Sequence, residues 1–162
     1  MGRDLRFSLA SAFEAAEQDR LALWVGEFLA SRGSDNAALA AGLSGRRHWW
    51  LGPVQLPVDE LVRLAGPEDD VTCPIEPEEW EDDVEEMEES LGKGWEPPPL
   101  LVEYRDGELL LQDGNHRYEA LVRAGEDDVW ALVWFDDPAT CERFRETLPD
   151  AGRVQPAPLP DA

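Results

Sequence analysis

Residues 100–124 constrain the fold more than any other part of the chain. Two short apolar runs, LLVEY at 100–104 and ELLLQ at 108–112, flank the turn sequence RDG. Apolar runs on both sides of a glycine-containing turn predict a β-hairpin. The sequence DGNHR at 113–117 follows at once, and 115–124 has the apolar spacing of a helix. A helix that starts directly at the end of a strand indicates a sheet with helices packed against it.

The remaining periodic segments add further helices and strands. The expected elements are helices at 11–31, 37–43, 77–91 and 138–148, a short strand and a short helix within 54–66, and a buried strand at 128–135. Together with the hairpin they predict an α+β fold, in which helices surround a small mixed β-sheet.

The chain is expected to fold as one main unit with two extensions. Its 162 residues suit a single domain. Residues 1–50 are predicted to form a helical N-terminal extension, and 51–148 the main domain. The proline-rich residues 149–162 are predicted to be a disordered tail.

The segment 67–90 carries 13 acidic residues and neither Lys nor Arg. A charge run of this kind is typical of disorder. Its second half differs, because Trp80, Val84, Met87 and Leu91 have the spacing of one helical stripe. We therefore expect a helix at 77–91 with a buried stripe and a solvated acidic face.

The formal net charge of −22 restricts the partners of this protein. This composition disfavours direct binding of nucleic acid or of an anionic membrane, because both depend largely on Lys and Arg contacts to phosphate. The N-terminus lacks the continuous apolar core of a signal peptide, and no apolar run approaches the roughly 20 residues that span a membrane. A cytoplasmic location is expected. Cys73 and Cys141 belong to no CxxC pair or Cys/His cluster, so a zinc site is not expected.

The DGNHR sequence has the features of a phosphate site. Backbone amides at the start of a helix lack acceptors within the helix, and the helix dipole adds partial positive charge there. Gly114 would allow an oxygen to approach the backbone closely. His116 and Arg117 would add donors, and Asn115 could cap the helix or donate its amide.

Asp113 needs a different explanation, because a carboxylate repels phosphate. It could bind a Mg²⁺ ion carried by the phosphates, or orient His116. Purely structural roles remain open for the basic pair. His116 could bond a carbonyl at the start of the helix, and Arg117 could pair with Asp113 or Glu119.

The sequence DGNHRYEAL resembles the G-x-x-R-x-x-A box of the ParB/sulfiredoxin superfamily. The resemblance extends over about 54–136, from VQLPVDEL through the hairpin to VWALVWF. It implies a ParB/sulfiredoxin-like sheet with packed helices, and a box that binds nucleotide phosphates: ATP in sulfiredoxins, CTP in ParB and ADP in the serine kinases. Residue by residue, the phosphate-binding role falls on Gly114, Asn115, His116 and Arg117.

Two departures from the family pattern narrow the activity that the resemblance implies. Sulfiredoxins carry a catalytic cysteine directly after the box glycine, where this chain has Asn115. ParB proteins carry a DNA-binding helix-turn-helix after this domain, and the strongly acidic charge argues against that role here.

Two classes of function therefore remain. The first is a Mg²⁺-dependent phosphotransferase or nucleotide hydrolase, with Asp113 and His116 as catalytic candidates and Asp113 as the metal-ligand candidate. The second is a non-catalytic regulatory or protein-interaction module that keeps the pocket. Its partner protein would bind the N-terminal helices or the acidic helix 77–91. A nuclease is a weaker alternative. Only the naming of the family suggests it, and the net charge of −22 disfavours it.

Overall fold

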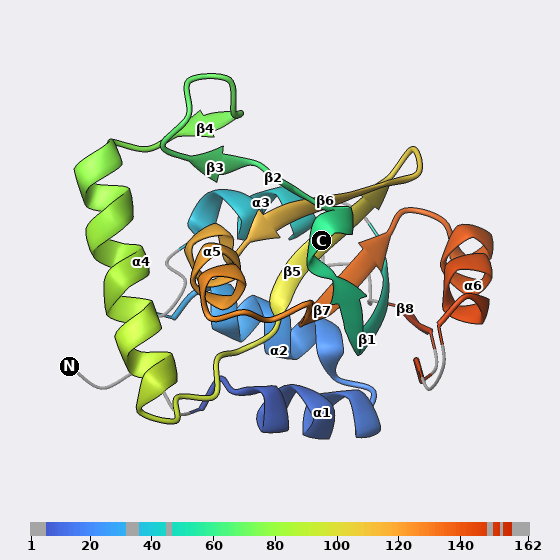
Figure 1. Cartoon of the computed structure of the whole chain (residues 1–162). Coiled ribbons are helices and arrows are strands. Elements are labelled where there is room, and N and C mark those ends of the chain that lie inside the picture. The colour runs from blue at the N-terminus through green and yellow to red at the C-terminus, as the bar shows by residue number, and fades with distance from the viewer. Residues whose placement is uncertain (1–5, 32–35, 45–46, 149–150, 153, 157–162) are drawn as a thin grey trace.

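The computed structural model describes residues 6–31, 36–44, 47–148, 151–152 and 154–156. Figure 1 shows a central twisted sheet with helices on both of its faces. The helices are α1 (Leu9–Glu17), α2 (Leu21–Leu29), α3 (Ala37–Ser44), α4 (Pro77–Gly92), α5 (Asn115–Arg123) and α6 (Pro138–Glu146). The strands are β1 (Trp49–Pro57), β2 (Leu61–Arg63), β3 (Ala65–Gly66), β4 (Cys73–Pro74), β5 (Leu100–Arg105), β6 (Glu108–Asp113), β7 (Asp128–Phe135) and β8 (Gln155–Pro156).

The main sheet has the strand order β2-β6-β5-β7-β1-β8 and is mixed. β2 pairs parallel with β6, and β5 pairs parallel with β7. The β5–β6 hairpin and the β1–β7 pair are antiparallel. The predicted α+β class is therefore confirmed, and the hairpin supplies two inner strands of the sheet.

The two faces of the sheet are buried by different helices. In β7, Leu132 and Trp134 belong to a cluster with residues of α1 and α2, whereas Val133 and Phe135 belong to the opposite cluster. That second cluster includes Cys141 of α6 and is covered in part by α5 and α6. The alternation follows the period of two along a strand. Because both faces are covered, β7 carries the continuous apolar sequence that predicted its burial.

The N-terminal region contains two helices where the periodicity predicted one at 11–31. α1 ends at Glu17, and Asp19 then adopts a positive φ of 57°. The Arg20 amide donates to the Ala15 carbonyl over 2.8 Å, which closes the end of α1 before α2 begins. The prediction of one continuous helix is wrong, although the predicted apolar stripe of α2 is buried against the sheet.

The segment 54–66 also differs from its prediction. β1 starts at Trp49 and continues through Gly52 and Pro53, where its pairing with β7 shifts register. A short 3-10 helix occupies Val58–Glu60, and β2 and β3 replace the expected helix. Bulges accommodate glycine and proline in a strand, and pairing of β2 with β6 outweighs the local helical preference.

The acidic helix forms as predicted. α4 begins with Pro77 in its first turn, and the Glu76 carboxylate accepts a bond from the Glu79 amide over 2.9 Å. Trp80 and Val84 are buried against Ala120 of α5, with Met87 and Leu91 packed beside them. One apolar stripe therefore holds an otherwise acidic helix on the fold.

Part of the C-terminal tail is ordered. Gln155 and Pro156 form β8, which pairs with Trp50 and Trp49 at the edge of the sheet. The Gln155 side chain donates to the Ala16 carbonyl over 2.7 Å and accepts from the Leu21 amide over 3.4 Å. The prediction of a disordered tail is wrong for these residues, because the free edge of β1 supplies partners. Residues 157–162 lie outside the described part.

The N-terminal helices share a core with the sheet, through Trp50, Leu101, Leu132 and Trp134. The division into a 1–50 extension, a 51–148 domain and a 149–162 tail stays a prediction. Among the described residues, none of the helices combines the length and the apolar character needed to cross a membrane.

Candidate functional site

The predicted phosphate site lies where β6 passes into α5. Gly114 joins them with φ 101° and ψ 25°, a left-handed conformation that favours glycine. The Tyr118 amide donates to the Gly114 carbonyl over 2.8 Å, so the helix starts immediately. The amides of residues 115–117 belong to the first turn and have no acceptor within the helix. This junction therefore has the backbone arrangement that favours an anion.

Asn115 fixes the start of α5 against the strands around it. Its Oδ1 accepts bonds from the amides of Leu64 and Ala65 over 3.0 and 3.1 Å. Its Nδ2 donates to the Leu111 carbonyl over 3.2 Å. Neither of the two predicted uses of this side chain, helix capping or donation to phosphate, accounts for these bonds. They tie the β2–β3 segment to the helix.

Arg117 and Asp113 form a buried ion pair. Their side chains are 5% and 9% exposed, with 3.4 Å between Arg117 Nη2 and Asp113 Oδ2. The same Nη2 donates to the Pro99 carbonyl over 3.2 Å, and the guanidinium lies 5.3 Å from the Phe28 ring centre. Asn36 Nδ2 donates to Asp113 Oδ1 over 3.0 Å. One of the structural pairings that the sequence left open is therefore present.

His116 is the most accessible side chain of the box, with 28% of its surface exposed. Its ring lies 4.5 Å from the Trp80 ring, and Nε2 lies 3.7 Å from Asp83 Oδ2. Burial lowers the pKa of His116, although the carboxylates of Asp83 and Glu79 oppose this shift. A lowered folded-state pKa means that His116 contributes stability above its ordinary pKa, and that this contribution is lost as the pH falls.

Two arginines beside the box are engaged with carboxylates. Arg63 pairs with Glu68 and with Glu119, the latter over 3.3 Å, and its guanidinium lies 4.9 Å from the Trp80 ring. Arg123, near the end of α5, bonds Glu81 over 2.7 Å and Glu119 over 3.1 Å. The Arg123–Glu81 pair connects α4 to α5, and the Arg63–Glu119 pair connects β2 to α5, so both stabilise the packing around the box.

The structure brings Asp113, Gly114, His116 and Arg117 together at the junction of β6 and the first turn of α5. It also adds three supporting residues that sequence reasoning did not connect to the site: Phe28, Asn36 and Trp80. The apolar stripe of 77–91 predicted the burial of Trp80. No sequence pattern near the box could have indicated Phe28 or Asn36. Phe28 belongs to α2 and Asn36 directly precedes α3, and both reach the box only because the tertiary fold packs these segments against it.

The metal and cysteine predictions can be placed on the structure. Within the described ranges, no three His, Cys, Asp or Glu side chains converge as a metal-binding group. Asp113 could still contribute one carboxylate to a nucleotide-borne Mg²⁺, and that role stays a prediction. Cys73 is an exposed thiol, and Cys141 is a buried one whose pKa burial raises to about 12.

Replacing Gly114 by Ala should lower the free energy of unfolding by roughly 2–4 kcal/mol, from left-handed strain and overpacking together. A Cβ atom there would lie 2.6 Å from Leu100 Cδ2 and 2.7 Å from Arg117 Nη2. Gly125→Ala is the matched control, because Gly125 has φ 89° and no atom within 4 Å of an added Cβ. Urea denaturation measures both. Equal losses would show that steric crowding at Gly114 is negligible.

No protein-family model matches the chain, and no curated protein sequence matches it. Solved structures do. Sulfiredoxin from Arabidopsis thaliana is 21% identical with a TM-score of 0.38, over 57% of this chain and 94% of that one. The C-terminally truncated chromosome-partitioning protein ParB from Caulobacter crescentus, complexed with CTP-gamma-S, is 29% identical with a TM-score of 0.39. That match covers 59% of this chain and 52% of ParB.

A third similar structure is a Pnob8-like ParB-N domain, 18% identical with a TM-score of 0.36, over 63% of this chain and 36% of that one. The chain thus spans nearly all of the sulfiredoxin and about half or less of these ParB chains. The solved structures that this chain matches thus include a sulfiredoxin and ParB proteins, the two kinds of protein that the sequence resemblance named.

Proposed function

We propose that this protein binds the phosphate groups of a nucleotide at the N-terminus of α5. The observation that carries the proposal is the junction itself. Gly114 turns β6 directly into α5, so the first amides of the helix gather where the dipole is positive. His116 lies in the same turn and remains partly exposed. The resemblance of DGNHR to a phosphate-binding box supports the same location.

The groups that would hold the phosphate are the amides of residues 115–117 and the His116 ring. Nε2 of His116 is itself buried and faces the Asp83 carboxylate at 3.7 Å, so the ring would meet a ligand through its exposed part. Arg117 is buried and paired with Asp113, so it would hold the helix start in place and add little net charge to the site.

A non-catalytic regulatory module is the second candidate, and one observation favours it. Asp113, one of the two catalytic candidates, is buried and paired with Arg117. Catalysis through Asp113 would require it to leave this pair and act on the ligand. The two candidate functions therefore share one binding site. A Mg²⁺-dependent phosphotransferase or hydrolase would convert the bound nucleotide, and the module would not.

Thermal denaturation with ATP, ADP, CTP, GTP or pyrophosphate, each with and without Mg²⁺, tests the proposal. A ligand that binds the folded state stabilises it by about 2.7 kcal/mol at 100 times its Kd. We expect at least one nucleotide to raise the melting temperature of the wild type. His116→Glu should abolish that rise, because the new carboxylate repels phosphate. The variant should still fold, with a lower melting temperature of its own, since a carboxylate suits a helix N-terminus but is repelled by Asp83 and Glu79.

Arg123→Ala is the matched control. It also removes a basic side chain from α5, but from the last turn of the helix. Its own melting temperature should fall modestly as the bonds to Glu81 and Glu119 are lost, while the ligand-induced rise remains. No rise with any ligand, or a rise that His116→Glu leaves intact, would overturn the assigned site. Release of inorganic phosphate from a bound nucleotide then separates an enzyme from a module.

A further inference from the structure

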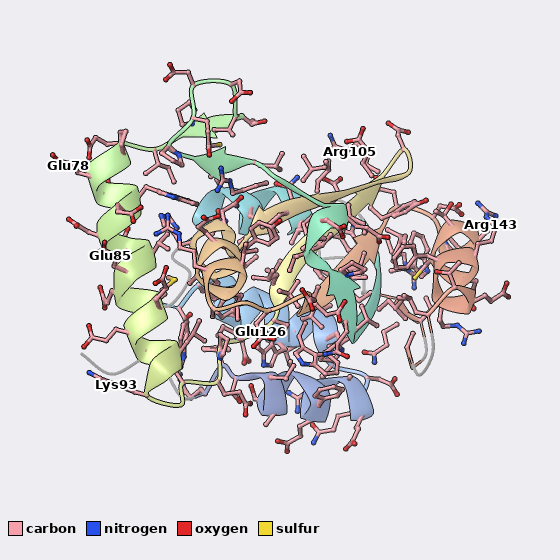
Figure 2. All side chains as sticks on the ribbon, in the orientation of Figure 1. Glu78, Glu85, Lys93, Arg105, Glu126 and Arg143 are labelled. Atoms are coloured by element: carbon pink, nitrogen blue, oxygen red, sulfur yellow. The ribbon has the colours of Figure 1, made fainter. Side chains whose placement is uncertain are left out.

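A second site lies at the opposite end of α5 from the phosphate-binding box. A cleft of about 620 Å³ is bordered by the C-terminal ends of α4 and α5, the following loop 93–99, and the edge of the β1–β7 pair. Its volume is within the range of ligand pockets. In Figure 2, Lys93 lies at the end of α4 and Glu126 just beyond α5, which locates the region.

The floor of the cleft is apolar and aromatic. Leu91, Trp95, Leu121 and Trp130 line it together with two prolines of the 93–99 loop. Leu91 and Leu121 are only partly buried by the rest of the protein, each packed at the margin of a core cluster. A concave apolar surface of this kind favours an apolar side chain, and indole faces also attract cations.

The polar lining of the cleft is anionic. Four carboxylates line it, those of Glu88, Glu96, Glu126 and Asp128, and no Lys or Arg is among its lining residues. Glu96 accepts the Ala10 amide over 2.9 Å and so joins the loop to α1. The other three remain on the wall, with Glu126 and Asp128 exposed.

The backbone reinforces this negative charge. α4 and α5 both end at the cleft, where their last carbonyls carry partial negative charge. One oxygen of Glu88 is buried and accepts no hydrogen bond from the described residues, although Arg123 Nη1 lies 3.6 Å away. A buried acceptor of this kind is normally satisfied by a donor. A ligand N–H group entering the cleft could supply it.

We propose that this cleft binds a segment of a partner protein in which Lys or Arg side chains alternate with apolar ones. Charge complementarity selects a cationic occupant, because four carboxylates and two helix ends converge there and no Lys or Arg lines the cleft. Glu88 has Arg123 beside it at 3.6 Å, whereas Glu126 and Asp128 are exposed. Several separate carboxylates match several cationic groups held on one chain, and the apolar floor accepts the side chains between them. The overall charge of −22 would accelerate the encounter with such a partner.

The first test measures binding of a capped peptide, acetyl-GKLRGKLRG-amide, by calorimetry at physiological ionic strength, where long-range attraction is screened. The control peptide acetyl-GKSRGKSRG-amide has the same charge and no leucine. We expect the leucine peptide to bind the full chain at least about tenfold more tightly than the serine peptide, since each 1.4 kcal/mol of apolar burial gives that factor. Equal binding of the two peptides would overturn the role of the apolar floor.

The second test compares two double variants that each remove two acidic charges. Glu126→Gln with Asp128→Asn alters the cleft, and Glu78→Gln with Glu85→Gln alters the outer side of α4, where Figure 2 labels Glu78 and Glu85. All four side chains are exposed, so both proteins should fold. The cleft variant should weaken peptide binding about tenfold, and the α4 variant less than about twofold.

Equal weakening in both double variants would mean that the peptide senses only the net charge, and would overturn the proposal. Absence of peptide binding to the wild type would do the same. Spermidine serves as the small-cation arm. If spermidine bound with cleft dependence and the peptide did not, the occupant would be a small polyamine and the polypeptide assignment would be wrong. None of these substitutions touches residues 113–117, so the result is independent of nucleotide binding.

Discussion

Replacing Arg117 by Ala should lower the free energy of unfolding by about 3–5 kcal/mol, because it leaves the buried Asp113 carboxylate without its charge partner. The side chain also contributes its hydrogen bond to the Pro99 carbonyl and its contact with the Phe28 ring. Urea denaturation followed by circular dichroism measures the loss. The family resemblance alone would predict loss of nucleotide binding without unfolding. The burial of the pair predicts instability first.

Two further variants distinguish the effect of breaking the buried ion pair from the effect of removing any arginine. Arg143→Ala removes an exposed guanidinium from α6 and should change stability by no more than about 0.5 kcal/mol. Arg117→Met together with Asp113→Asn should recover part of the loss, since an apolar or neutral replacement of a whole buried pair is often tolerated. If Arg117→Ala were as stable as Arg143→Ala, the buried pair would contribute nothing to folding.

Replacing Trp80 by Ala should cost about 3–5 kcal/mol, the usual range for removing a large buried aromatic side chain. Trp80 is 2% exposed and packs with Val84 and Ala120 between α4 and α5. It also supports the His116 ring at 4.5 Å. An isolated helix of this length is marginal in water, so α4 depends on this stripe for its stability.

Hydrogen exchange measured along the chain gives the more specific readout. In Trp80→Ala, the amides of α4 should exchange much faster, while those of β5 and β7 stay protected at low denaturant. Glu85→Ala, on the exposed side of the same helix, should leave α4 protected. Unchanged protection of α4 in Trp80→Ala would mean that the acidic helix is held on the fold by its other contacts.

The instability expected for Arg117→Ala decides how nucleotide binding is tested. A variant that unfolds more easily also loses ligand, so it cannot report on a contact with phosphate. His116→Glu avoids this difficulty, because His116 is partly exposed and a carboxylate suits the first turn of a helix. Arg117→Ala therefore tests the contribution of the buried ion pair to folding, and His116→Glu tests the contact of the box with phosphate.

Several elements could be predicted from sequence because their signals are local. The β5–β6 hairpin, β7 and α4 lie within a residue or two of their predicted bounds. In each case the apolar period and a turn or capping residue agree, and tertiary packing reinforces that preference. The α5 helix belongs to the same group, since Gly114 marks its start and Gly125 follows its end.

Other elements depended on partners that are distant in sequence. The residues of β2 have a helical pattern but pair with β6, and Gln155 pairs with Trp50 across more than a hundred residues. One continuous α-helix was expected at 11–31, but the chain turns at Asp19 and forms two helices, α1 and α2. Pairing energy from another strand, or packing on a sheet face, overrides local propensity at such positions.

The sequence by itself determined the α+β class, the hairpin that opens into a helix, and the location of a box with the residue types of a phosphate site. Those features follow from the period of apolar residues and from glycine at the turns. Only the tertiary structure decided what the box residues do. Asn115 ties two strands to α5, and Arg117 and Asp113 neutralise each other in the interior, while His116 stays accessible on Trp80. Burial and charge pairing depend on which distant segments meet, and no local pattern carries that information.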